Sequence, residues 1–510
     1  MILSWLIILL MAAGILSWIA GRFNPVWPKA IALISLLAGL VITLVIWMSG
    51  SASDLLAQGK WIREIRAEWI PRFGIEFHLA MDGISLLLVV LTMFLGMIAV
   101  MASWKEIGHR PGFFHFNLLW VLAGITGVFL AMDLFLFYFF WEVMLIPMYF
   151  IIAIWGHEKR VEASYKFFIF TQAGGLLMFI AILALYFIHG KTTGSYTFNY
   201  REILLTFPGT NVAPWIMAGF MAAFLVKLPA VPVHSWLPAA HTQAPTAGSI
   251  ILAGLLLKTG AYGLFRFIIP LFPDASRAFA PAAMIVGIVG ILYGAKLAFA
   301  QKDLKRLIAY TSISHMGFVI IGVFAFNSLA FQGAFMQILA HGISTGALFM
   351  IAGALQERLH TRNLEQMGGF WSKAPKMGGI SLVFVLASLG LPGLANFVGE
   401  FMVLTGVFIN YPVYAIIAAL GFIASVIYAL YIMQKVFFGK ERTNISLKDF
   451  SAREMIMGLS MVIVIIWLGL FPNAVFKTSQ KPMEKLEQTV ERSFETAPHQ
   501  NQKQLSGYNK

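Results

Sequence analysis

The sequence predicts an all-α polytopic membrane protein with about 14 transmembrane helices. Hydrophobic residues make up 59% of its 510 residues, only 12% are charged, and the mean hydropathy is +0.81. Apolar stretches recur along the chain at close to the roughly 20 residues that a helix needs to cross a bilayer. Two of these stretches are interrupted by proline, at 225–229 and at 389–393. We therefore expect a helical bundle in which helices 7 and 12 are broken.

The predicted helices follow one another with mostly short connections. The first lacks the basic start and the cleavage site of a secretory signal, so it is expected to remain as a span. Longer connections are expected at 50–78 and 189–213, and a polar tail follows residue 476. The helix cores are predicted near residues 3–20, 29–49, 80–103, 113–131, 132–154, 166–188, 214–236, 246–265, 279–300, 307–326, 330–355, 378–409, 413–434 and 455–474.

The positions of the two broken helices suggest a chain of five segments, two of which are inverted repeats. Helices 7 and 12 lie five apart, and proline-interrupted spans in corresponding positions are typical of transporters built from inverted repeats. The alternative is that each proline only kinks a packing helix. The segments are helices 1–3 (1–112), a first inverted repeat of helices 4–8 (113–265), a second of helices 9–13 (279–435), helix 14 (454–476) and a polar C-terminal tail (477–510).

Basic residues predict the orientation of the bundle. The loops after odd-numbered helices hold roughly twenty Lys and Arg, whereas the opposite loops hold about eight. Because cytoplasmic loops carry the excess of Lys and Arg, the odd loops are expected in the cytoplasm and both termini outside.

Seven ionisable residues lie inside the apolar spans. A charge at the bilayer centre costs about 3 kcal/mol, so such residues usually face a bundle interior or a water path and mark a pathway. A buried acid and lysine that approach one another stabilise each other's charged forms, and histidine exchanges protons near neutral pH. The alternatives are a fixed ion pair at the acid of helix 5 and interhelical hydrogen bonds at single histidines. The seven candidates for a proton relay are Glu142, Lys227, His234, Lys258, His315, His341 and Glu400.

Several classes of function are disfavoured. The chain contains no cysteine, which excludes disulfides and cysteine-held iron–sulfur clusters. The net charge of +13 is spread over the loops, so nucleic-acid binding is not expected. No dinucleotide fingerprint and no metal-ligand spacing is present. Asp133, between helices 4 and 5, is expected to be a solvated turn or cap.

Four long motifs resemble those of the proton-antiporter-like membrane subunits of respiratory complex I, and the resemblance covers nearly the whole chain. That family also includes the large subunits of multi-subunit cation/proton antiporters. The motifs lie at 141–149 (WEVMLIPMY), 226–238 (VKLPAVPVHSWLP), 243–249 (QAPTAGS) and 303–317 (DLKRLIAYTSISHMG).

Within this family, three features separate the chain from the L-type and N-type subunits. Glu400 is an acid where those subunits and the antiporters typically carry lysine, the segment 360–369 fits a third branch, and no long lateral helix follows helix 14. Two departures concern acids that are common in relatives: Ala239 and Ile251 stand in their places. These two positions are therefore not expected to serve cytoplasmic proton entry.

The resemblance implies a role for each candidate. Glu142 resembles the acid that tunes the central lysine, Lys227, and Lys258 resembles the connecting lysine. His234, His315 and His341 resemble the polar axis between two half-channels, and Glu400 the terminal acid of the second half-channel.

The resemblance also implies a setting. The chain would be a proton-translocating subunit of NADH:quinone oxidoreductase in a bacterial inner membrane, flanked by L-type and N-type subunits and by lipid. It would bind no cofactor itself, whereas NADH, FMN, iron–sulfur clusters and quinone would bind to partner subunits. Two other functions stay open: a subunit of a cation/proton antiporter that exchanges Na⁺ for H⁺, and a structural spacer in a membrane arm.

Overall fold

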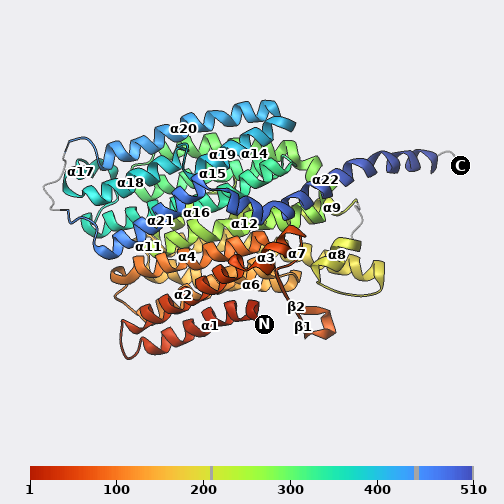
Figure 1. Ribbon diagram of the computed structural model, residues 1–510, viewed down its shortest axis with the longest axis horizontal. Coiled ribbons are helices and arrows are strands. Elements are labelled where there is room, and N and C mark those ends of the chain that lie inside the picture. Colours follow the sequence, from red (N-terminus) through yellow and green to blue (C-terminus); the bar gives the residue numbers. More distant parts are fainter. Residues whose placement is uncertain (207–210, 441–446, 508–510) are drawn as a thin grey trace.

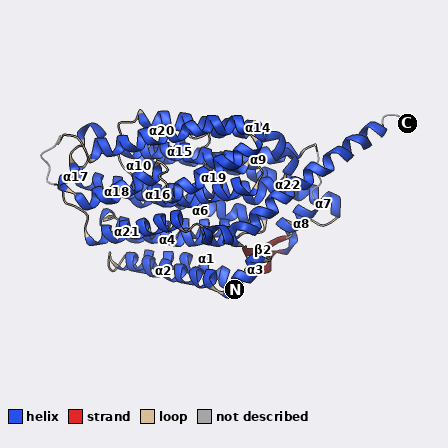
Figure 2. Cartoon of the chain, turned by 45° about the horizontal axis from the view of Figure 1, so that its top comes forward, coloured by secondary structure: helices blue, strands red, loops and turns tan. Residues whose placement is uncertain are grey.

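Helices that run side by side along one axis form the body of the molecule (Figures 1 and 2). The structure is a computed structural model that describes residues 1–206, 211–440 and 447–507, with side chains described to residue 492. At one end of the bundle lie a β-hairpin, the short helices α3 (Gly50–Ala57) and α8 (Tyr200–Thr206), and both termini (Figure 1). We call this the hairpin end. The opposite end carries α17 (Phe370–Lys373) and is called the α17 end.

Within the described residues, twelve helices are long and apolar enough to cross a membrane. The seventh of these, Thr246–Leu271, comprises α11 (Thr246–Ile251), α12 (Leu257–Gly263) and α13 (Ile269–Leu271) with π-helical segments at Leu252–Leu256 and Leu264–Ile268, and it is called helix 8 after its predicted position. The others are α1 (Ile2–Ala20), α2 (Trp27–Met48), α4 (Gly83–Glu106), α5 (Pro111–Leu130), α6 (Leu134–Trp155), α7 (Arg160–Thr193), α14 (Pro273–Phe299), α15 (Leu304–Val323), α16 (Ser328–Leu359), α20 (Pro412–Val436) and α21 (Ala452–Leu470).

Helices 7 and 12 are broken, as predicted, rather than kinked. The first consists of α9 (Ala213–Lys227) and α10 (Trp236–Gln243), and the second of α18 (Pro375–Ser388) and α19 (Ala395–Asn410). Twelve continuous spans and two broken ones are consistent with the 14 predicted helices. The relation of the two halves as inverted repeats stays a prediction.

Protein donors meet the carbonyl groups that the breaks release. Proline removes a backbone donor and ends the regular ladder, which an apolar medium tolerates only if the freed groups find partners. The indole Nε1 of Trp236 donates to the carbonyl of Val226 at 2.9 Å, and the hydroxyl of Ser425 donates to the carbonyl of Leu389 at 3.2 Å. Both breaks are therefore built into the packing of the bundle.

The hairpin was not predicted from the sequence. Strand β1 (Arg63–Ile70) pairs antiparallel with β2 (Ile75–Met81) through a turn at Pro71–Phe73 (η1). The first strand is mostly exposed and rich in charged residues, whereas the second is largely buried against the bundle. Such a short, half-polar pair of strands contains no long apolar stretch that would mark it in the sequence.

A long helix, α22 (Asn473–Gly507), follows α21 and takes up most of the polar tail. It runs along the hairpin end and then leaves the bundle (Figure 1). A short 3-10 turn, η4 (Leu364–Gln366), completes the elements at the α17 end.

Burial separates central from peripheral helices. In helix 8 and in α16 the most apolar stretch is 100% buried, and in α15 it is 94% buried. In α2 and α21 only 33% is buried, which leaves apolar side chains on the outer surface for lipid. Three of the seven candidate residues lie on the central helices and are therefore shielded on every side.

A glycine in the break of helix 12 allows a test of its backbone. Gly393 has a φ of 95°, and the nearest atom to an added Cβ would be Leu470 Cδ2 at 3.8 Å, so only backbone strain opposes alanine. We expect Gly393→Ala to lower the free energy of unfolding by about 1–2 kcal/mol. Gly379→Ala in α18 is the matched control, because nothing lies within 4 Å of its added Cβ and its backbone is helical. Equal thermal stability of the two purified variants would contradict the expectation.

Candidate functional site

Four buried ionisable side chains lie in series across the centre of the bundle. Lys258 Nζ on helix 8 lies 2.6 Å from His341 Nδ1 on α16. The ring of His341 lies 5.6 Å from that of His315 on α15, measured between centroids, and His315 Nδ1 lies 2.8 Å from Glu400 Oε1 on α19. Each of the four is at most 1% exposed. The structure therefore brings together four of the seven predicted residues in one chain, which we call the central relay.

Polar neighbours that the sequence analysis did not single out surround the Glu400 end of the central relay. Gln337 Nε2 donates to Glu400 Oε1 at 2.7 Å, and the hydroxyls of Ser388 and Tyr428 each lie 3.2 Å from His315 Nε2. Ser388 is the last residue of α18, so the break in helix 12 presents its hydroxyl to the histidine. The available sequence signal was a polar residue within an apolar span.

Lys227 and Glu142 are not in direct contact. Lys227 is the last residue of α9 and is 1% exposed, and its Nζ lies 5.4 Å from the ring centres of both Trp141 and Phe167. No ion pair joins it to Glu142 on α6, and neither Lys227 Nζ nor Glu142 Oε1 has a hydrogen-bond partner among the described residues. The two charges interact through space, and the aromatic faces stabilise the ammonium.

Helix 8 packs tightly against the end of α9. A Cβ added to Gly260 would lie 2.6 Å from the carbonyl oxygen of Phe224 and 3.0 Å from Cβ of Lys227. Gly260, two residues after Lys258, thus allows the backbone of helix 8 to approach the break of helix 7. Lys227 therefore lies next to the helix that carries Lys258 of the central relay.

His234 lies away from the central relay. It sits in the connection between α9 and α10, is half-buried, and its ring centroid lies 5.9 Å from that of Tyr293 on α14. No contact joins it to the other six predicted residues in the part of the chain that the structure describes. Its place on the polar axis stays a prediction.

Three further ionisable groups lie towards the α17 end and were not predicted as site residues. His241 is fully buried, stacks on the ring of Phe349 at 4.3 Å, and neither ring nitrogen has a described partner. Lys305 is fully buried and donates to the carbonyl of Ala244 at 3.2 Å. Glu106 accepts from the backbone N–H of Thr246 at 3.0 Å.

A polar cavity of 960 Å³ opens above these groups at the α17 end. Its lining includes Glu106, His157 and Arg362. Burial, together with the cations Lys305 and Arg362, lowers the pKa of His157 to about 4, so this imidazole is neutral near pH 7. The lining carries four acids, Glu106, Glu158, Asp303 and Glu357.

Comparison with known proteins decides the family. Residues 131–428 match the family described as NADH:quinone oxidoreductase/Mrp antiporter, transmembrane. The chain is 50% identical over 506 residues to NADH-quinone oxidoreductase subunit M of Escherichia coli, which covers 97% of this chain and 99% of the relative. The chain belongs to this family of membrane subunits. Two relatives at 50% identity, from Escherichia coli and Pseudomonas aeruginosa, are M subunits, which confirms the separation from the L and N types that Glu400 indicated.

Solved structures agree with this assignment. A chain of respiratory complex I from Thermus thermophilus with bound NADH superimposes with a TM-score of 0.86 at 30% identity, covering 96% of this chain and 99% of that chain. A chain of the Mrp complex from Dietzia sp. superimposes with a TM-score of 0.82 at 20% identity, covering 96% and 99%. The second likeness concerns the fold alone.

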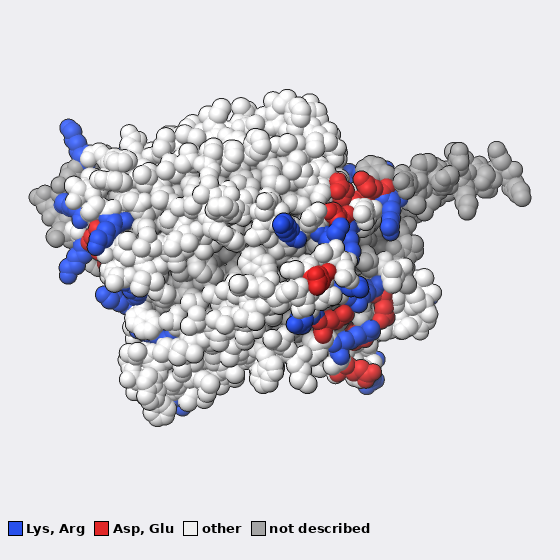
Figure 3. Space-filling model, in the orientation of Figure 1, with Lys and Arg blue, Asp and Glu red and all other residues white. Residues whose placement is uncertain are grey.

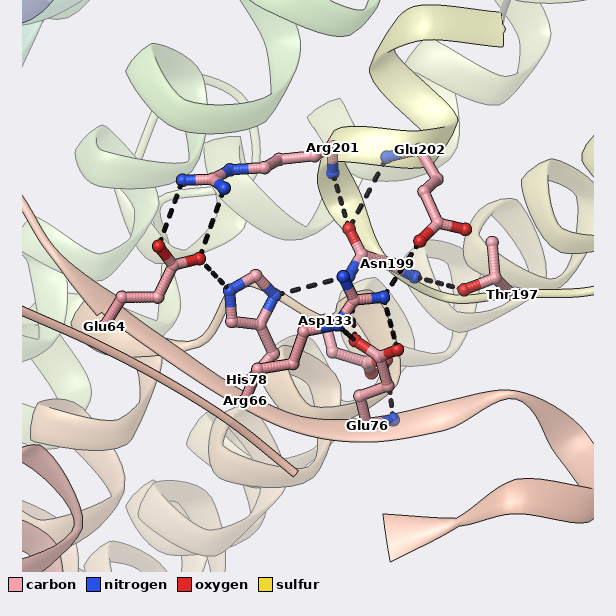
Figure 4. A network of polar contacts seen from close by, with 9 residues as sticks. All are labelled: Glu64, Arg66, Glu76, His78, Asp133, Thr197, Asn199, Arg201 and Glu202. Atoms are coloured by element: carbon pink, nitrogen blue, oxygen red, sulfur yellow. Dashed lines mark hydrogen bonds and ion pairs between the residues drawn. The ribbon is translucent and has the colours of Figure 1, made fainter. Parts of the chain in front are cut away.

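In this family member a second polar cluster ties the hairpin to the bundle (Figure 4). Arg66 donates two hydrogen bonds to Glu76, at 2.7 and 2.6 Å, and Asn199 Nδ2 donates to the same carboxylate at 2.8 Å. His78 Nε2 lies 2.8 Å from Glu64 Oε1. Although burial opposes ionisation, the hydrogen bonds from Arg66 and Asn199 hold the pKa of Glu76 below its usual value.

Asp133 belongs to this cluster and corrects one expectation. It caps α6 as predicted, since its Oδ1 accepts from the N–H of Leu136 at 2.9 Å, and its Oδ2 accepts from the N–H of Glu76 at 3.1 Å. It is 0% exposed, however, so the prediction that it is solvated was wrong. The hairpin covers it, and burial raises its pKa to about 7.

The raised pKa of Asp133 predicts a pH effect on stability. Between about pH 4 and pH 7 the folded chain retains a proton that the unfolded chain releases, so the free energy of unfolding falls as pH rises through this window. Asp133→Asn cannot ionise, but its NH2 group replaces one of the two oxygens that accept from backbone N–H groups. We expect the stability of the variant relative to the parent to rise between pH 4 and pH 8 by up to about 4 kcal/mol, because only the parent loses stability through this window. A parallel pH dependence of the two melting temperatures would contradict this.

Proposed function

We propose that this chain is the M subunit of the membrane arm of a bacterial NADH:quinone oxidoreductase and that it translocates protons. The observation that carries the proposal is the central relay, in which an ammonium, two imidazoles and a carboxylate lie in series inside the bundle. Such groups are expensive to bury, and in membrane proteins they mark proton pathways. NADH oxidation and quinone reduction in partner subunits would drive the transfers.

The proposed route enters at the α17 end. We propose that protons enter the polar cavity at Glu106 and pass by way of the fully buried Lys305 and His241 to Lys258. From Lys258 they move through His341 and His315 to Glu400. Histidine suits the middle positions because it gives and takes a proton near neutral pH.

Glu142 and Lys227 act in this proposal as a switch. Each charge lowers the cost of burying the other, so a change in their separation alters the proton affinity of Lys227. The absence of a direct ion pair between these two described residues leaves Lys227 free to approach or to leave the acid. A subunit that acted only as a structural spacer in a membrane arm would not need this pair of buried charges.

The α17 end is proposed to face the cytoplasm of a bacterial inner membrane. Lys and Arg predominate over acids at this end on the face shown in Figure 3, whereas the hairpin end mixes both signs. The excess of basic residues favours the cytoplasmic side. Both termini, at the hairpin end, would then lie outside.

The proposed partners are the other subunits of the complex. L-type and N-type subunits are proposed to flank the chain in the membrane arm, and NADH, FMN, iron–sulfur clusters and quinone to bind elsewhere in the complex. The absence of cysteine from the sequence agrees with this division. The 50% identity to an M subunit favours this function over a cation/proton antiporter, for which the likeness is one of fold.

Replacement of the central lysine tests the proposal. In inverted membrane vesicles, Lys227→Ala is expected to lower NADH-driven proton uptake tenfold or more, a loss on the order of that seen on removal of a proton-transfer group. Blue-native electrophoresis verifies assembly, and Lys477→Ala, at an exposed lysine of α22, is the control. Normal proton uptake in the assembled Lys227→Ala complex would refute the role of Lys227 as a switch.

Glu142 allows a graded test of the switch. Glu142→Ala removes the partner charge of Lys227 and is expected to uncouple or slow an assembled complex by about tenfold. Glu142→Asp keeps the charge on a shorter side chain and is expected to be milder. Glu491→Ala, at an exposed acid of α22, should leave uptake unchanged. Equal activity of the Ala and Asp variants would show that the carboxylate is not required.

A further inference from the structure

Helix 8 carries a second set of polar side chains between Lys258 and the hairpin end. Tyr262 and Arg266 follow Lys258 at intervals of four residues, which places them on one face of the helix. Arg266 Nε donates to the hydroxyl of Tyr262 at 3.0 Å, so the two side chains are in contact. Lys258 lies one helical turn further into the bundle than Tyr262, about 6 Å along the helix axis.

The hydroxyl of Tyr262 is fully engaged. It donates to the carbonyl of Phe129 at 3.0 Å and accepts from Arg266, and the residue is 1% exposed. Its single proton is therefore committed to a backbone acceptor. The ammonium of Lys258 contacts the carbonyl of Ala253 and the ring of His341 instead.

The guanidinium of Arg266 is fixed from several sides. Its Nη2 donates to Asp82 Oδ2 at 2.6 Å, and its Cζ lies 5.2 Å from the ring centres of both Trp61 and Tyr262. The side chains of Arg266 and Asp82 are 11% and 10% exposed. An ion pair stacked between two aromatic rings holds one geometry.

A cavity at the hairpin end reaches this ion pair. Its volume is 830 Å³, and its lining includes Trp61, Asp82, Tyr262 and Arg266 as well as Lys485 from α22. Solvent from the hairpin end can therefore approach to within one helical turn of Lys258. Without a barrier at this point, protons on Lys258 would have a short way out that bypasses His341 and Glu400.

We propose that Arg266, held by Asp82, Trp61 and Tyr262, is a plug that closes the hairpin end of helix 8 to protons. Arginine does not release its proton in proteins, so it cannot pass one on, and a fixed cation raises the energy of any further cation that approaches. Protons on Lys258 are thereby directed sideways to His341. The inference rests on the proposed function, in which Lys258 carries protons.

Passive proton leak tests the plug in the intact complex. Purified complex is reconstituted into liposomes without NADH, a pH gradient is imposed with valinomycin and potassium to clamp the potential, and its decay is followed. Arg266→Gln is expected to speed the decay several-fold. Arg266→Lys keeps the cation and is expected to leak less than Arg266→Gln, and Arg72→Gln, at an exposed arginine of the same end, should match the parent.

A double variant separates the plug from general damage. Arg266→Gln combined with Lys258→Ala is expected to restore the parental decay, because the leak would pass through Lys258, whereas a disordered chain would leak regardless. An assembled Arg266→Gln complex with parental decay, or a leak that persists in the double variant, would overturn the proposal. Should Arg266→Gln fail to assemble, Arg266→Met removes the charge from a long side chain and carries the same expectation.

The proposed function and the plug are tested by different measurements. NADH-driven proton uptake by Lys258→Ala reports on the relay, whereas passive decay in the Arg266 variants reports on the plug. Normal uptake in Lys258→Ala would refute the relay through this lysine. Parental decay in Arg266→Gln together with impaired uptake in Lys258→Ala would refute the plug alone.

Discussion

Buried charges and freed backbone groups must find partners inside the protein, and the rest of the structure depends on this constraint. In a bilayer no solvent compensates for an unpaired carboxylate or ammonium. Lys258, His341, His315 and Glu400 meet the constraint collectively, since each lies in contact with the next. The same contacts that make the charges tolerable also make proton transfer between them possible. Stability and proton transfer therefore favour the same arrangement of these four side chains.

The breaks in helices 7 and 12 also help buried charged groups to find partners inside the protein. Ending α18 at Ser388 presents a hydroxyl to His315, and glycine at position 390 leaves room for the carboxylate of Glu400, whose Oε2 would lie 3.2 Å from an added Cβ. At the other break Lys227 ends α9, where its ammonium faces Trp141 and Phe167. A continuous helix in either place would carry the same residues without these neighbours.

The two ends of the bundle differ in how fully their polar groups are paired. The α17 end opens a wide polar cavity towards fully buried groups that have few partners, such as His241. At the hairpin end, by contrast, polar groups are closely paired: Asp133 caps α6 and is covered, Glu76 is held by Arg66 and Asn199, and Arg266 is bound by Asp82. An entrance with unsatisfied groups and an opposite side with satisfied ones fits a route in which protons enter from one side and are not lost directly to the other.

The sequence by itself determined the membrane class, the spans, both breaks and the five candidates that prove to be buried, because hydropathy, proline and intramembrane charge are local properties of the chain. Only the tertiary structure decided which candidates meet. It joined Lys258 to Glu400 through two histidines, left His234 apart, separated Glu142 from Lys227, and added His241 and Lys305. It also buried Asp133 beneath a hairpin whose short strands carry no strong apolar pattern. Contacts between helices depend on their rotation and crossing, and no single stretch of sequence encodes either.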